Sequence, residues 1–111
     1  MLPVKNRLKK EIDFKRVLQK GKPYYSENFI IKKLNTEQQE YRVGFVISKK
    51  VSKKAVLRNK LRRQLVEVVK KTALQPGQDI VIIPKNKENI TNLKFQELKT
   101  EVQAVIKKIG K

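Results

Sequence analysis

The residues best suited to chemistry in this sequence are cations gathered between Ser48 and Arg63. On a helical wheel of about 100° per residue, one arc of about 140° holds four polar side chains: Arg58, Asn59, Arg62 and Arg63. Arginine presents a planar fork of donors that matches phosphate oxygens, and asparagine offers both a donor and an acceptor. This arc is therefore predicted to recognise phosphates and 2′-hydroxyl groups.

Lysines extend the basic face beyond the arc. Lys60 flanks the opposite edge of the apolar stripe, and four more lysines precede the helix: Lys49, Lys50, Lys53 and Lys54. They approach the helix N-terminus, where backbone N–H groups also favour anions. A basic helix face is usually only a solvated face, but the clustering here, in a chain of net charge +18, favours a polyanionic partner.

The composition indicates a folded domain. Lys and Arg number 28 against 10 Asp and Glu, a balance that opposes compaction by self-repulsion unless a polyanion offsets it. A hydrophobic fraction of 39% is too high for a disordered basic tail. The length of 111 residues predicts one domain over 1–111 with a modest core.

The chain lacks the usual equipment for protein-side hydrolysis. There is no His and no Cys, which removes the commonest general base, thiolate metal ligands and disulfides, and no carboxylate cluster is evident. We therefore predict no catalytic residue and no metal ligand in this chain. The first residues lack a signal-peptide pattern, and the longest apolar run, Ile80 to Ile83, is too short to span a bilayer, so a cytoplasmic protein without a membrane partner is expected.

The basic segment needs a scaffold, and the hydrophobic pattern predicts one. A short helix presents Phe14, Val17 and Leu18 on one face, begins near Glu11 and ends before Gly21. A second helix spans 55–71, with an apolar stripe of Leu57, Leu61, Leu65 and Val68. A third amphipathic helix begins near residue 95 and follows a polar loop over 85–92.

Strands are predicted between these helices. A weak strand covers 22–26, and Phe29 to Leu34 and Tyr41 to Ser48 suggest a hairpin because a polar loop separates them. Asp79 to Pro84 is a continuous apolar run of the kind buried in a sheet. For Tyr24 and Tyr25, packing at a turn or a sheet edge is favoured over contact with a bound single strand. The predicted order is αβββαβα, an α+β sandwich of helices on one sheet.

The basic helix contains the run Arg58-Asn59-Lys60 followed by Arg62-Arg63. Further segments accompany it at a characteristic spacing: Ser48-Lys49-Lys50, Ala55-Val56, Asn6-Arg7-Leu8, Asp13-Phe14, Val17, Gly21, Phe29 and Arg42-Val43-Gly44. With these motifs the chain resembles the bacterial ribonuclease P protein family. The resemblance covers residues 6–67 well and reaches 79–83 weakly. Lys60 departs from the family's usual Arg, which keeps the charge and loses the fork. Leu18 and Lys32 stand where some relatives carry aromatics.

The resemblance implies a fold and a division of labour. The fold would resemble the second domain of ribosomal protein S5, with a left-handed βαβ crossover where general rules predict a right-handed one. The chain would be the subunit of an endoribonuclease whose RNA holds the active site and its Mg²⁺ and removes the 5′ leader from precursor tRNA. The basic helix would face that RNA, and a cleft at Phe14, Leu18 and Lys32 would take the leader.

Two other functions are weighed against this one. A ribosomal or other structural RNA-binding protein would share this size and charge. A DNA-binding module is disfavoured, because the strand-rich middle leaves no second helix beside 55–71 for a helix-turn-helix.

The role of Phe14 has two interpretations. Burial of its ring in the core competes closely with stacking of the ring on a base.

Overall fold

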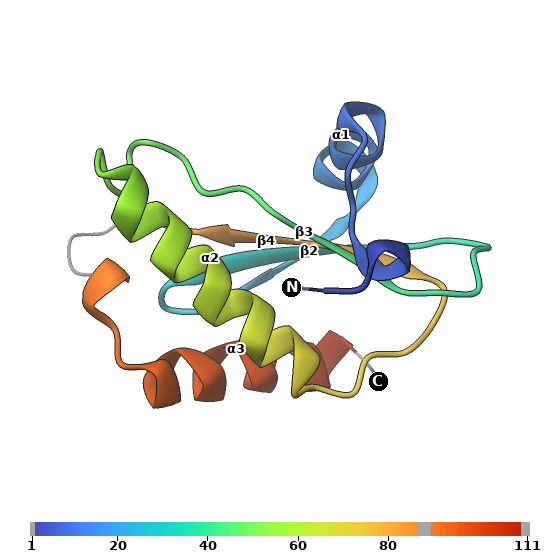
Figure 1. Ribbon diagram of the computed structural model, residues 1–111. Coiled ribbons are helices and arrows are strands. Elements are labelled where there is room, and N and C mark those ends of the chain that lie inside the picture. Colours follow the sequence, from blue (N-terminus) through green and yellow to red (C-terminus); the bar gives the residue numbers. More distant parts are fainter. Residues whose placement is uncertain (1, 87–89, 110–111) are drawn as a thin grey trace.

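The computed structural model describes residues 2–86 and 90–109. Its elements follow the predicted order αβββαβα, with a short 3₁₀ helix before the first element and another after the last strand (Figure 1). Their bounds are η1 Val4–Asn6, α1 Glu11–Lys20, β1 Lys22–Tyr25, β2 Phe29–Asn35, β3 Arg42–Phe45, α2 Ala55–Lys70, β4 Gln78–Pro84, η2 Ile90–Asn92 and α3 Phe95–Ile109. Of the polar loop predicted over 85–92, residues 87–89 lie outside the described residues, and its end forms η2.

The predicted hairpin is wrong. The sheet has the order β1-β2-β4-β3, in which β2 is antiparallel to both β1 and β4, and β3 is parallel to β4. Strand β4 lies inside the sheet between β2 and β3, and its Ile80, Val81 and Ile82 are fully buried, with side chains on both faces. Strand β3 is consequently an edge strand that returns to β4 through α2, and it is shorter than the predicted 41–48. The hand of this crossover stays a prediction.

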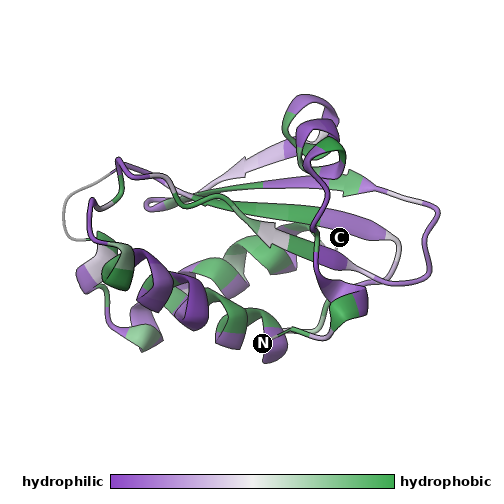
Figure 2. Ribbon diagram, turned by 45° about the horizontal axis from the view of Figure 1, so that its top comes forward, coloured by the Kyte–Doolittle hydropathy of each residue, from purple (hydrophilic) through white to green (hydrophobic). Residues whose placement is uncertain are grey.

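The larger core lies under α2 and α3, which cover the same face of the sheet (Figure 1). Strands contribute Phe29, Ile31, Val43 and Ile80, and α2 contributes its predicted apolar stripe, in which Leu61, Leu65 and Val68 are buried. Apolar segments of both layers face each other in Figure 2. The amphipathic pattern of α2 therefore directs its basic arc away from the sheet.

Helix α1 packs alone on the opposite face. A small buried cluster of Leu8, Val17 and Val81 joins it to the sheet. Around that cluster lie half-buried apolar side chains: Phe14, Leu18, Leu34, Val46 and Ile83. Figure 1 shows that α1 stands over one end of the sheet, so the rest of this face has no helix above it.

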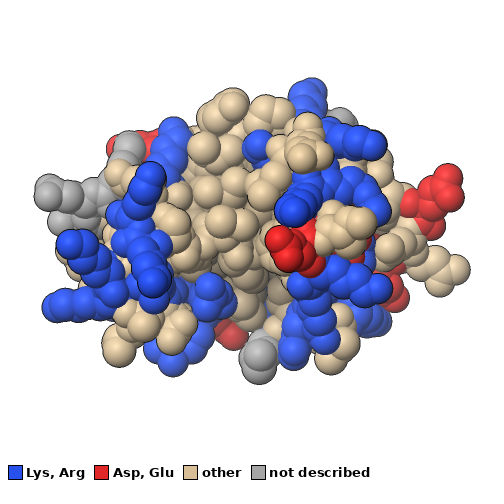
Figure 3. All heavy atoms as spheres, turned by 90° about the horizontal axis from the view of Figure 1, so that it is seen from above, with Lys and Arg blue, Asp and Glu red and all other residues tan. Residues whose placement is uncertain are grey.

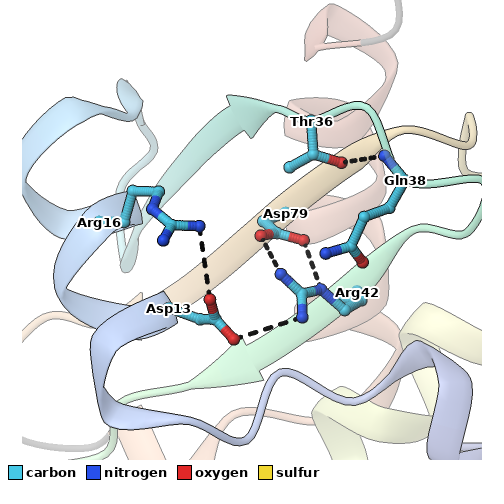
Figure 4. A network of polar contacts seen from close by, with 6 residues as sticks. All are labelled: Asp13, Arg16, Thr36, Gln38, Arg42 and Asp79. Carbon is cyan, nitrogen blue, oxygen red and sulfur yellow. Dashed lines mark hydrogen bonds and ion pairs between the residues drawn. The ribbon is translucent and has the colours of Figure 1, made fainter.

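One arginine fixes α1 to the sheet (Figure 4). Arg42 on β3 donates from Nε and Nη2 to the two carboxylate oxygens of Asp79 on β4, at 2.9 and 2.7 Å. Its Nη1 donates to Asp13 of α1 at 3.3 Å, and Arg16 contacts the other oxygen of Asp13 at 3.5 Å. The hydrogen bond with Asp79 raises the pKa of Arg42, against a smaller opposing effect of burial. The guanidinium therefore joins three elements.

Removing this guanidinium should destabilise the fold. The Asp79 side chain is 1% exposed, so Arg42→Met leaves a buried carboxylate without its partner. We expect the free energy of unfolding to fall by about 3–5 kcal/mol, measured by urea denaturation followed by circular dichroism.

Arg16→Met is the matched control, because it removes an equal charge from the same network at a half-exposed site. It should cost about 1 kcal/mol or less. Equally small losses in both variants would show that the network does not hold α1.

Candidate nucleic-acid interface

The predicted basic arc lies on the surface of α2. Asn59, Arg62 and Arg63 of the arc are exposed, on a helix whose other face is buried. Lys60, at the other edge of the apolar stripe, is exposed as well. In the described residues, the ion pairs involve no cation between 48 and 63. These side chains are therefore not neutralised by neighbouring carboxylates and remain available to phosphate.

Arg58 differs from the rest of the arc. It is half-buried, and its Nη1 donates to the backbone carbonyl of Ser52 at 2.8 Å. It therefore ties the start of α2 to the preceding loop. The helical wheel places Arg58 on the polar face but has no signal for this bond, since the bond depends on the path of the loop.

The loop before α2 presents the four predicted lysines. Lys49, Lys50, Lys53 and Lys54 are exposed. Two serine-based turns shape the loop, with the N–H of Lys50 donating to Ser48 Oγ and that of Lys54 to Ser52 Oγ. The first turn of α2 carries no acidic residue. The lysines and the N-terminal end of the helix dipole are both positive and repel each other. Binding of an anion at this end is therefore favoured.

A groove of about 600 Å³ lies between the N-terminal segment, β3 and α2. Its apolar lining includes Leu8, Phe14, Phe45 and Val66. Its charged lining consists of four cations and one carboxylate: Arg7, Lys9, Arg62, Arg63 and Glu67. The sequence predicts the Phe14 site and the α2 arc as separate surfaces. The structure brings Phe14 and two of the arginines to one groove.

Gly44 determines where the Phe14 ring lies. A Cβ on Gly44 would collide with the tip of that ring, so the ring packs directly on the β3 backbone. A glycine inside a strand often marks such a close approach. Sequence reasoning missed this role, although Gly44 belongs to the motif that carries the resemblance. Phe14 itself is half-buried, which leaves part of its ring accessible.

The other two predicted cleft residues hold α1 in place. Leu18 is half-buried against the Val17 and Val81 cluster. Lys32 Nζ donates to the backbone carbonyl of Leu18 at 2.8 Å. This bond satisfies a carbonyl near the C-terminus of α1, where a cation also interacts well with the helix dipole. Lys32 is therefore engaged in the structure and offers no ring to a base.

Seen from the α1 side, the surface has an uncharged strip between two groups of Lys and Arg (Figure 3). One group lies over α1, and the other lies over the loop before α2 and the start of that helix. The half-buried side chains of Val46 and Ile83 belong to this face. Positive borders attract a phosphate backbone and an apolar floor accepts bases, which is how proteins bind single-stranded nucleic acid.

Two further features bear on the possible ligands. Within 2–86 and 90–109, no cluster of three or more His, Cys, Asp or Glu side chains is arranged to hold a metal ion. None of the helices in the same ranges is long and apolar enough to cross a membrane.

Comparisons with known proteins agree in sequence and in fold. The model of the family described as Ribonuclease P matches residues 2–110. The ribonuclease P protein component of Dictyoglomus turgidum is 38% identical over 97% of this chain and 92% of its own length. The solved RNase P protein of Thermotoga maritima superposes with a TM-score of 0.83 at 28% identity, covering 92% of this chain and 96% of that one. That of Staphylococcus aureus gives 0.81 at 29% identity, covering 94% of each chain.

The match extends over both the basic helix and the α1 face, so it includes every element that positions the interface. The chain belongs to the ribonuclease P protein family.

Proposed function

We propose that this chain, as the protein subunit of ribonuclease P, binds the catalytic RNA through α2 and the 5′ leader of precursor tRNA beside α1. The observation that carries the proposal is the uncharged strip between two basic borders on the α1 side of the sheet. Phe14 packs half-buried against the small apolar cluster of that side. An unpaired leader needs a surface for its bases and cations for its phosphates, and the strip and its borders supply these two.

In this proposal the RNA carries out the hydrolysis. Mg²⁺ ions held by that RNA would supply the charge stabilisation of the reaction, and the protein would bind and orient its partners. The absence of His and Cys supports this division, since those side chains most often serve as general base or nucleophile. The cations of α2 would offset phosphate repulsion when the two RNAs come together.

The rival functions have less support. A structural ribosomal protein would not be expected to match the ribonuclease P family over the whole interface. A helix-turn-helix needs a second helix next to the recognition helix, whereas α2 is followed by β4.

The isolated protein should be inert and should activate an RNA. Purified, RNA-free protein is expected to leave precursor tRNA intact. Added to a ribonuclease P RNA at low Mg²⁺, it should promote release of the 5′ leader, measured by gel electrophoresis of end-labelled substrate. Accurate cleavage by the protein alone would contradict the proposal.

The α2 arginines should contribute to the salt dependence of RNA binding. Removing one cation that binds a phosphate should lower the slope of log affinity against log salt by about one unit or less. Arg62→Ala with Arg63→Ala should therefore weaken binding to the ribonuclease P RNA, by on the order of 1–3 kcal/mol for each arginine that binds a phosphate. Arg58 is left unchanged because it also holds the loop.

Lys107→Ala with Lys108→Ala removes the same charge from exposed sites on α3 and is the control. The slope of log affinity against log salt should be lower for Arg62→Ala with Arg63→Ala than for this control. Both double variants should retain the wild-type circular dichroism spectrum. Identical slopes would place the RNA on another surface.

Phe14→Leu should separate leader binding from assembly. Leucine keeps most of the apolar volume but offers no ring, and base stacking on an aromatic is worth about 1–3 kcal/mol. The holoenzyme should lose roughly five- to 150-fold in affinity for precursor tRNA and little for mature tRNA. Ile12→Ala, at a 63% exposed site on the same helix, should change neither.

Equal losses for both RNAs would contradict a leader contact by Phe14. A fall in the thermal midpoint of the free protein large enough to account for the loss would instead assign Phe14 to the core. Because Phe14 and two α2 arginines line one groove, assembly with the RNA is measured separately for this variant.

A further inference from the structure

Tyr25 is a large aromatic side chain that the fold leaves uncovered. It is 66% exposed at the end of β1, which is an edge strand of the sheet. The neighbouring Tyr24 is half-buried and packs against the core under α2 and α3. Both tyrosines lie at the sheet edge, as expected from the sequence, but only Tyr24 packs against the core, whereas most of Tyr25 is exposed.

The register of the sheet places Tyr25 on the α1 side. Successive residues of a strand point to opposite faces, so Tyr25 faces away from the core that Tyr24 contacts. Tyr25 pairs with Ile30 of β2, and Ile30 pairs with Ile83 of β4. Ile83 belongs to the apolar cluster on the α1 face. These pairs form a row across three strands, which we call the Tyr25 row.

The side chains of the Tyr25 row are only partly covered by the rest of the protein. Ile30 and Ile83 are both half-buried, so the row offers accessible apolar surface beside the ring. The next row on this face contains Lys32 and Val81, where the Lys32 amine is bound to the carbonyl of Leu18 beneath α1. Neighbouring strands are about 4.8 Å apart, so Tyr25 and Ile83 lie about 10 Å apart across two strand spacings.

The chemistry of this surface suits an unpaired base. Every base has a π-face that can stack on tyrosine, and the half-buried isoleucines add apolar contact without requiring a particular base. An exposed aromatic beside other apolar side chains favours binding of a partner, because its apolar surface is otherwise left in water. The occupant that this surface fits is single-stranded RNA, because its bases are free to stack and the net charge of +18 attracts its phosphates.

We propose that Tyr25 is a second base-stacking residue for the precursor tRNA leader, acting on a different nucleotide from Phe14. This inference rests on the proposed function, in which the leader lies on the α1 face. Phe14 stands at the groove beside β3, and Tyr25 stands on the opposite edge strand, β1. The leader therefore crosses the sheet between the two rings. One of the two contacts requires a longer leader than the other, and the direction in which the leader runs decides which one.

The test compares Tyr25→Leu with Tyr25→Phe in the reconstituted holoenzyme. Binding is measured for mature tRNA and for precursors with leaders of increasing length, and 2-aminopurine at single leader positions reports stacking. Tyr25→Leu should weaken binding about fivefold or more, but only for leaders long enough to reach it, and should relieve quenching at one position. Tyr25→Phe keeps the ring and should behave as wild type. Phe14→Leu should relieve quenching at a different position.

The outcomes separate this inference from the proposed function. Wild-type affinity and quenching in Tyr25→Leu, together with a leader-dependent loss in Phe14→Leu, would overturn the Tyr25 contact alone. No preference of the wild-type holoenzyme for precursor over mature tRNA would overturn the proposed function and this contact with it. Because Tyr25 is exposed, Tyr25→Leu should retain the wild-type thermal midpoint. A lowered midpoint with equal losses for every RNA would show a structural role and also overturn the proposal.

Discussion

The ion pairs of the Arg42 guanidinium hold both α1 and the edge strand β3 on the sheet. The guanidinium fixes the edge strand β3 to β4 through two hydrogen bonds with Asp79, and it holds α1 through Asp13. A chain with 28 cations and 10 anions has few carboxylates, and two of them bind this arginine. Because both carboxylates are largely buried, the fork geometry of arginine satisfies them where a lysine would not.

The buried carboxylates are thus neutralised, whereas most of the described surface cations are in no ion pair. The cations of the loop before α2 and of α2 itself have no carboxylate partners in the described parts of the chain, apart from Lys70 near the helix end. The folded protein therefore carries a repulsive field that an RNA would relieve. The same feature that lowers the stability of the free protein provides the driving force for binding, through release of the RNA's counterions.

Apolar surface left exposed on the α1 side of the sheet is a second feature that serves the proposed function and not the stability of the fold. Two helices cover one face of the sheet, whereas the single helix α1 covers only part of the other, so Phe14, Val46 and Ile83 remain half-buried and Tyr25 is exposed. The position of α1 is fixed by polar contacts at both of its ends. Asp13 near its start meets Arg42, and the Leu18 carbonyl near its end accepts from Lys32. These contacts keep the uncharged strip open by holding α1 in place.

The sequence by itself determined the elements and the chemistry of the surface. Helix and strand periodicities are local, so the bounds of α1 and α2 were predicted to within one residue, and the stripe of Leu61 and Leu65 was assigned correctly to the core. Only the tertiary structure decided which strands pair. The expected hairpin was replaced by a central β4, because burial of both its faces outweighs the short loop between β2 and β3. The roles of Arg58, Lys32, Gly44 and Tyr25 also depend on contacts or exposure set by distant segments, and the residue types carry no signal for these.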